Sequence, residues 1–156
     1  MAKAFDPCKA IELALRIPRA DRKTILRIAL FAAERAAEIA NEPSFTQAVS
    51  DVQKKINLPD DGSIIQMGPL VSATDSRPAR DAKNCRDVLI RMANKKDAVD
   101  PYIVSHFASL TMAQARYVFQ AIARAQGMDG QEAFVAEKKR QVDDVIAVSP
   151  LSAMRS

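Results

Sequence analysis

Apolar side chains recur every three or four residues along most of this chain, which is the spacing of α-helices with one buried face. The clearest run spans residues 20–41. Leu26, Leu30 and Phe31 widen its apolar surface beyond one stripe, and a helix that is apolar around most of its circumference usually lies at the centre of its domain. The main stripe consists of Ile25, Ile28, Ala29, Ala32, Ala36 and Ile39.

Residues that begin and end helices predict about seven helices, two of them short, in a single all-α domain spanning 1–156. The motifs Ser44–Gln47 and Thr111–Gln114 match capping boxes, in which side chains satisfy the first backbone N–H groups of a helix. Gly127 matches the residue that follows a helix end. No alternation of strands and helices is present. The helices are expected at about 7–17, 20–41, 45–57, 78–95, 101–108, 111–126 and 130–148, followed by a flexible tail at 149–156.

Residues 58–78 break the helical pattern. The sequence Leu58-Pro-Asp-Asp-Gly62 is typical of a turn. Two structures are possible after this turn: a minimal hairpin with strands at 63–67 and 70–73, or one long irregular loop whose apolar residues fill a gap in the bundle. Pro69 disfavours regular strand pairing, and long loops of this kind are often functional.

Composition supports helices and excludes several classes of protein. Of the 75 apolar residues, 27 are Ala, whereas only 4 residues are Gly. Ala has the highest helix propensity and allows close helix packing, so we expect the Ala-rich helices at 20–41 and 111–126 to pack together. The scarcity of Gly argues against a phosphate-binding loop. Neither a signal peptide nor a membrane span is expected, and two isolated cysteines fit a reduced, cytoplasmic protein.

Candidate catalytic and metal-binding groups are few. His106 is the single histidine and shares a helix face with Tyr102, so it is expected to be a half-buried packing residue. Cys8, near the start of the first helix, and Cys85, on an apolar stripe, are also expected to be structural. No metal-ligand spacing is present. We therefore expect a protein that is not an enzyme and needs no cofactor or metal, and keep a site using His106 or Cys8 as a rival.

Positive charge is concentrated toward the N-terminus. The formal net charge is +4, and residues 1–57 carry ten Lys and Arg against seven Asp and Glu, whereas residues 98–156 carry six of each. Cations at the start of a helix oppose its dipole, so a cluster there suggests an anionic partner. Nucleic acid is one such partner; an acidic protein surface or a merely solvated face are the alternatives. The cluster comprises Arg16, Arg19, Arg22, Lys23 and Arg27.

Residues 101–126 also suggest a helix-turn-helix-like element, because a short helix, a tight turn and a longer helix are expected in succession. The pair is similar, over this segment alone, to the N-terminal helices of histone-like HU proteins, although no matching strand arms follow. An ordinary capped helical pair is the alternative. If the helix-turn-helix-like element binds nucleic acid, the residues expected to face outward and bind it include Arg116, Tyr117, Gln120 and Arg124, with Met112 and Ala113 beside them.

These observations favour a small helical, nucleic-acid-associated accessory protein. The alternative is an adaptor, chaperone or inhibitor that contacts a protein partner through the 58–78 loop, by Ile64, Ile65, Met67 and Leu70. Self-association is a further option, because Phe45, Val49, Val52 and Ile56 form a regular seam of the kind that joins two helices. No membrane partner is expected.

Overall fold

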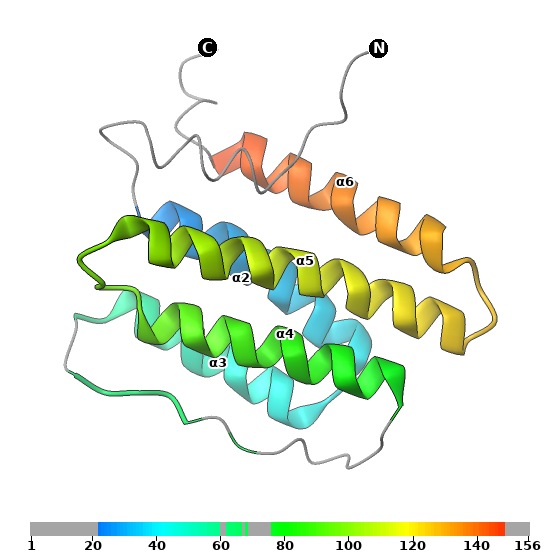
Figure 1. Ribbon diagram of the computed structural model, residues 1–156, viewed down its shortest axis with the longest axis horizontal. Coiled ribbons are helices and arrows are strands. Elements are labelled where there is room, and N and C mark those ends of the chain that lie inside the picture. Colours follow the sequence, from blue (N-terminus) through cyan, green and yellow to red (C-terminus); the bar gives the residue numbers. More distant parts are fainter. Residues whose placement is uncertain (1–21, 60–61, 67, 69–75, 149–156) are drawn as a thin grey trace.

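The computed structural model describes residues 22–59, 62–66, 68 and 76–148. These residues form a bundle of helices and contain no strand, which confirms the all-α prediction (Figure 1). The expected helix at 7–17 and the tail at 149–156 lie outside the described residues. The helices are α2 (Arg22–Ala40), α3 (Pro43–Asn57), α4 (Arg77–Asn94), α5 (Pro101–Ala125) and α6 (Gly130–Val148).

Helix α5 lies in the middle of the bundle. It packs against α2, α4 and α6, while α3 packs against α2 and α4. Figure 1 shows α4, α5 and α6 side by side in one layer, with α2 and α3 behind them. The expected packing between the two Ala-rich segments is confirmed, because α2 and α5 are in contact and both carry fully buried alanines, including Ala32 and Ala115.

The seam on α3 is part of the core of this chain. Phe45 and Val52 are fully buried, and Ile56 is almost so. Because α3 packs against α2 and α4, the seam is occupied within the monomer. The seam residues are therefore accounted for by packing within this chain, and self-association stays a prediction.

Several helix ends lie where the sequence predicts them. The Asp129 carboxylate accepts from the N–H groups of Gln131 and Glu132 at the start of α6, at 2.9 and 3.3 Å. Gly127, with φ +74°, follows the end of α5 in the left-handed conformation that favours glycine. Asp100 caps α5 by accepting from the N–H of Tyr102 at 2.9 Å.

The expected break near Ser109 is absent, and this is the main correction to the predicted fold. Residues 101–125 form one continuous helix, so the described part holds five helices where six were expected. No Gly or Pro interrupts the segment after its first residue. Thr111 caps nothing; its hydroxyl donates to the carbonyl of Phe107 at 2.8 Å, one helical turn earlier. A helix-turn-helix-like element at 101–126 is therefore excluded.

Helix α3 also begins earlier than its apparent capping box predicts. Pro43 occupies the first turn, where the missing N–H of proline costs nothing. The N-cap is Glu42, whose backbone carbonyl accepts from the N–H groups of Phe45 and Thr46, both at 3.0 Å. Ser44 consequently lies inside the helix.

The segment between α3 and α4 forms no strand at residues 62–66, so the described part of it supports the irregular-loop prediction. The side chain of Asn94 holds this segment on α4: it accepts from the N–H of Ile65 at 3.0 Å and donates to the carbonyl of Ile65 at 3.1 Å. Ile65 packs against the core, as expected, whereas Ile64 is 66% exposed.

Candidate nucleic-acid interface

The described part of the predicted N-terminal patch lies on the first turns of α2. Arg16 and Arg19 are outside the described residues. Arg22 donates from Nη2 to the carbonyl of Val99 at 3.3 Å, which places it against the connection between α4 and α5. Lys23 and Arg27 are exposed, and no acidic residue lies in the first turn of α2.

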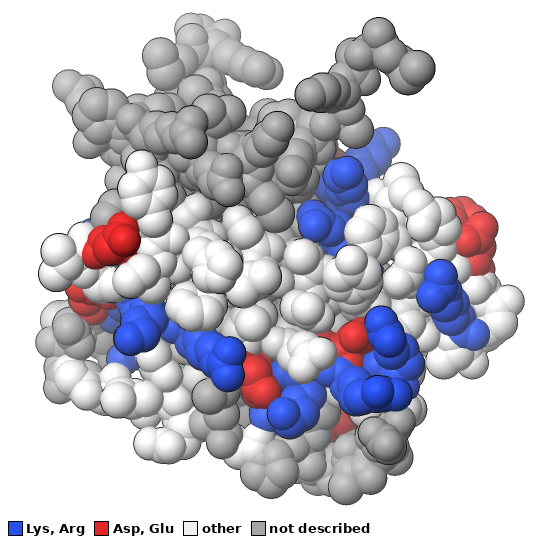
Figure 2. Space-filling view, viewed as in Figure 1, with Lys and Arg blue, Asp and Glu red and all other residues white. Residues whose placement is uncertain are grey.

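A second and longer row of cations follows the outer face of α4. We call it the α4 basic stripe and define it as Arg77, Arg80, Lys83, Arg91 and Lys95, all of which are exposed. Figure 2 shows this row of Lys and Arg across one face of the molecule, interrupted by acidic side chains. From Arg80 to Lys95 the stripe spans roughly 22 Å at 1.5 Å per residue. That equals the axial length of about six base pairs at 3.4 Å each.

The charge of this segment exceeds that of the whole chain. Residues 77–96 contain seven Lys and Arg against two Asp, a net charge of +5, compared with +4 for the full sequence. Dividing the sequence into thirds hides this excess, because Asp60, Asp61 and Asp75 of the preceding loop are then counted with α4. A charge count over each expected helix detects it.

Ion pairs neutralise only part of the stripe. Arg77 pairs with Asp81, and Lys83 pairs with Asp87, each at 3.2 Å and one helical turn apart. The cations of these pairs are exposed and the carboxylates are largely buried, and helical pairs of this spacing contribute about 0.3–0.5 kcal/mol. Within the described part of the chain, Arg91 and Lys95 form no ion pair, so the second half of the stripe presents uncompensated positive charge.

A polar pocket of about 240 Å³ opens at the other end of the stripe, between α4 and α5. Helix α5 contributes Gln114 and Tyr117. The Gln114 Oε1 atom is buried and has no hydrogen-bond partner, whereas Tyr117 is 41% exposed. Helix α4 lines the opposite wall with Arg77, Arg80, Asp81 and Asn84.

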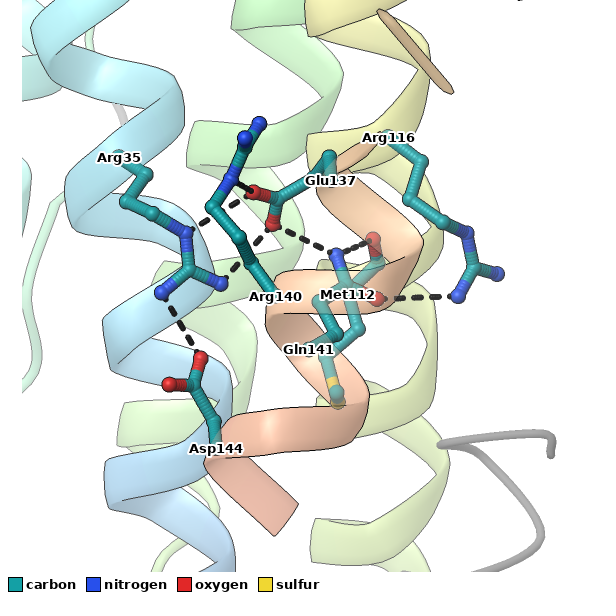
Figure 3. Close-up of polar contacts among 7 residues, drawn as sticks. All are labelled: Arg35, Met112, Arg116, Glu137, Arg140, Gln141 and Asp144. Carbon is teal, nitrogen blue, oxygen red and sulfur yellow. Dashed lines mark hydrogen bonds and ion pairs between the residues drawn. The ribbon is translucent and has the colours of Figure 1, made fainter. Parts of the chain in front are cut away.

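The residues predicted to read nucleic acid from the 101–126 element do not share one outer face. Met112 is fully buried, so the prediction that it faces outward was wrong, whereas Arg116 is half-buried and directs its guanidinium at α6 (Figure 3). Arg116 donates from Nη1 to Gln141 at 3.0 Å and lies over the ring of Phe134. Tyr117 is exposed but lines the pocket beside α4. Of the others, Arg124 is exposed, whereas Ala113 and Gln120 are half-buried.

A buried polar cluster ties α6 to α2 and α5 (Figure 3). Glu137 is fully buried and accepts two hydrogen bonds from Arg35, at 2.9 and 3.0 Å. Arg140 and Gln141 also donate to Glu137, at 2.9 and 3.0 Å. Gln141 further donates to the carbonyl of Met112 at 2.8 Å. The bonds between Glu137 and Arg35 on α2 and between Gln141 and the Met112 carbonyl on α5 join helices, so the cluster positions α6 on the bundle.

Charges within this cluster shift the pKa values of two members. Burial alone lowers the pKa of Arg35, but the hydrogen bonds and charges of Glu137 and Asp144 outweigh it and raise the pKa above its ordinary value. The pKa of Asp144 is also raised, because burial outweighs the ion pair that its carboxylate forms with Arg35 at 2.8 Å. The carboxylates of Glu137 and Asp143 add to this increase.

The described candidate catalytic residues, Cys85 and His106, belong to neither basic surface. Cys85 is fully buried; burial first, and then the nearby carboxylates of Glu137 and Asp81, raise its pKa, which keeps the thiol protonated. His106 is exposed, not half-buried as expected. Its ring packs edge-on against the ring of Phe107, with 5.5 Å between the two ring centroids. Cys8 is outside the described residues. Within the described ranges, no three His, Cys, Asp or Glu side chains group as metal ligands would.

The predicted protein-binding loop is described in part. Ile64 projects into solvent, whereas Ile65 is half-buried; Met67 and Leu70 are outside the described residues. A pocket of about 430 Å³ adjoins the loop, between α3 and α4. Its wall includes Arg86, which is 3% exposed and donates from Nε and Nη2 to Asp87 at 3.0 and 2.9 Å.

Of the described helices, none has both the length and the apolarity that a membrane span requires. No family model, no curated protein and no solved structure matches this sequence.

Proposed function

We propose that this protein is a non-enzymatic helical protein that binds nucleic acid, with the α4 basic stripe as its main contact surface. The observation that carries the proposal is the net charge of +5 over residues 77–96, of whose seven cations the five of the α4 basic stripe are exposed along one helix face. Arg22, Lys23 and Arg27 at the start of α2 supply further positive charge. The Arg22–Val99 contact places Arg22 against the connection that follows the end of the stripe, which also carries Asp97 and Asp100.

The chemistry of the stripe favours a polyanion over a folded protein partner. Protein interfaces usually have an apolar or aromatic centre surrounded by polar residues. The α4 basic stripe has no such centre, since its exposed members are Lys and Arg separated by Asn84 and partly buried Asp87. A row of cations about 22 Å long instead suits a phosphate backbone, where each neutralised phosphate releases condensed counterions.

Fluorescence anisotropy with a labelled oligonucleotide, measured over a series of salt concentrations, tests the proposal. Three to five phosphate contacts predict a slope of log K against log salt between about −2 and −5. The variant Arg91→Glu/Lys95→Glu should weaken binding at least tenfold and flatten the slope. Neither residue forms an ion pair in the described part of the chain, so the change breaks no contact seen there.

A matched control lies on α6. The variant Lys138→Glu/Lys139→Glu changes the net charge by the same amount, on a helix that packs against α5 and α2 and not along α4. We expect it to weaken binding much less. No measurable binding by the wild-type chain at low salt, or equal losses in both variants, would contradict the proposed surface.

The alternative function, a protein adaptor that uses the 58–78 loop, has one observation in its favour. Ile64 is 66% exposed beside the pocket of about 430 Å³. Isolation of the protein from its native host separates the two functions. An adaptor should lose its bound protein in Ile64→Asp and keep it in Arg91→Glu/Lys95→Glu. A nucleic-acid-binding protein should keep its bound nucleic acid in Ile64→Asp and lose it in Arg91→Glu/Lys95→Glu. A cytoplasmic location, the lack of enzyme activity and the oligomeric state stay predictions.

A further inference from the structure

We infer that the polar pocket between α4 and α5 holds an unstacked base of a single-stranded nucleic acid whose backbone follows the α4 basic stripe. This inference rests on the proposed function and specifies its substrate class. The pocket lies at one end of the stripe and contains two of its members, Arg77 and Arg80. A strand running along the stripe therefore passes the mouth of the pocket.

The lining suits a base better than a phosphate. Gln114 Oε1 is a buried acceptor that lacks a partner, whereas the Asp81 carboxylate on the opposite wall already accepts from Arg77 at 3.2 Å. The Gln114 acceptor requires an N–H donor, which a phosphate diester lacks and the edge of a base supplies. An unsatisfied buried acceptor is costly, so a base that donates to Gln114 recovers an interaction that the unbound protein is missing.

Tyr117 supplies the other element of base recognition, an exposed aromatic ring. It is 41% exposed and is supported by Phe134, whose ring centroid lies 5.6 Å from its own. Stacking of a base on an aromatic ring is tolerant of sequence. Bases in a duplex are stacked and paired, so only a single strand, or a base turned out of the helix, can use this pocket.

Three ligands of equal length separate this inference from the proposed function: a single-stranded oligodeoxynucleotide, its duplex, and an abasic oligomer with the same phosphates. We expect the single strand to bind at least fivefold more tightly than the abasic oligomer, as one stacked base supplies. Gln114→Leu and Tyr117→Ala should remove that preference and leave abasic binding unchanged. Arg91→Glu/Lys95→Glu should weaken all three complexes.

Tyrosine fluorescence gives a second readout. The chain has two tyrosines and no tryptophan, so Tyr102→Phe leaves Tyr117 as the single emitting residue. Base stacking should quench its emission with the single strand and not with the abasic oligomer. Tyr117→Phe, which preserves the stacking ring and its contact with Phe134, should retain the preference for bases even if Tyr117→Ala unfolds.

The results overturn the inference in two ways. Equal, salt-dependent binding of the single strand and the abasic oligomer would refute the base pocket and leave the α4 basic stripe in place. Tighter binding of the duplex than of the single strand would do the same. If none of the three ligands binds, both the proposed function and the inference fail.

Discussion

The variant Glu137→Gln tests the argument that the buried polar cluster holds α6 on the bundle. The Glu137 carboxylate is fully buried and receives hydrogen bonds from Arg35, Arg140 and Gln141, at 2.9 to 3.0 Å. Glutamine has nearly the same shape but no charge, and its N–H₂ group faces donors where an oxygen is needed. The change therefore leaves the arginines without their buried counter-ion and creates little empty space.

The structure sets the size of the expected effect. Removing one partner of a buried ion pair typically costs 3–5 kcal/mol, and we expect Glu137→Gln to cost about 3 kcal/mol, the lower end of that range. The lower end applies because the side chains of Arg35 and Arg140 are 25% and 43% exposed, and because Arg35 keeps Asp144 at 2.8 Å. Domains of this size are stable by roughly 5–15 kcal/mol. The variant should fold, with a melting temperature about 6–12 °C lower.

Urea unfolding followed by far-UV circular dichroism measures this loss directly. Glu132→Gln is the matched control, because Glu132 is an exposed glutamate in the same helix and should cost less than about 1 kcal/mol. A cycle with Arg35→Gln should give a coupling energy of at least about 1 kcal/mol. A loss in Glu137→Gln no larger than in Glu132→Gln, or strictly additive effects in the cycle, would refute the reasoning.

Three further predictions concern single residues. Because burial raises the pKa of Asp144, the stability that this group contributes is present at low pH and is lost as pH rises through its folded pKa. In urea titrations at several pH values, the stability of Asp144→Asn relative to wild type should therefore rise with pH above about 3.9. A difference in stability that does not change with pH would contradict this prediction. In Cys8→Ser, the buried Cys85 thiol should react with a thiol reagent only as fast as the protein unfolds, and complete labelling of the native protein within minutes would contradict its burial. Ser109→Gly should cost roughly 0.5 kcal/mol within a continuous helix, whereas unchanged or increased stability in chemical denaturation would point to a turn at that position.

Sequence periodicity predicted most of the fold because each signal was local. The stripe on 20–41 and Gly127 both act within one or two turns of a helix, and both lie where expected except at Ile39, which is 40% exposed. The break at Ser109 failed for a different reason. Ser and Thr occur at caps and inside helices alike, and the Thr111 hydroxyl donates to the Phe107 carbonyl instead of capping a helix.

The interface was harder to predict, because it depends on contacts between helices. A charge count over residues 77–96 reveals the cationic side of α4, but counting charge over longer segments assigned the excess to the N-terminus. Arg116 had the spacing of an outward residue, yet its guanidinium turns to Gln141 on α6, a residue 25 positions away. The pocket joins Gln114 to the wall of α4, and no local pattern in either helix indicates that pairing.

The cations at the two ends of α4 interact oppositely with the helix dipole, so their effects on stability and on binding distinguish a functional stripe from a structural one. Cations near a helix C-terminus stabilise it, so Arg91 belongs there with or without a ligand. Arg80 lies in the first turns, where the dipole opposes positive charge and no acidic residue of the first turn compensates. From the dipole alone, Arg80→Gln should leave stability unchanged or raise it by up to about 1 kcal/mol, and Arg91→Gln should lower it slightly. Both variants should weaken nucleic-acid binding to a similar extent. Urea unfolding and anisotropy on the same two variants make this comparison. A stability loss above about 1 kcal/mol in Arg80→Gln would assign Arg80 to the fold, because only a structural contact could then outweigh the dipole.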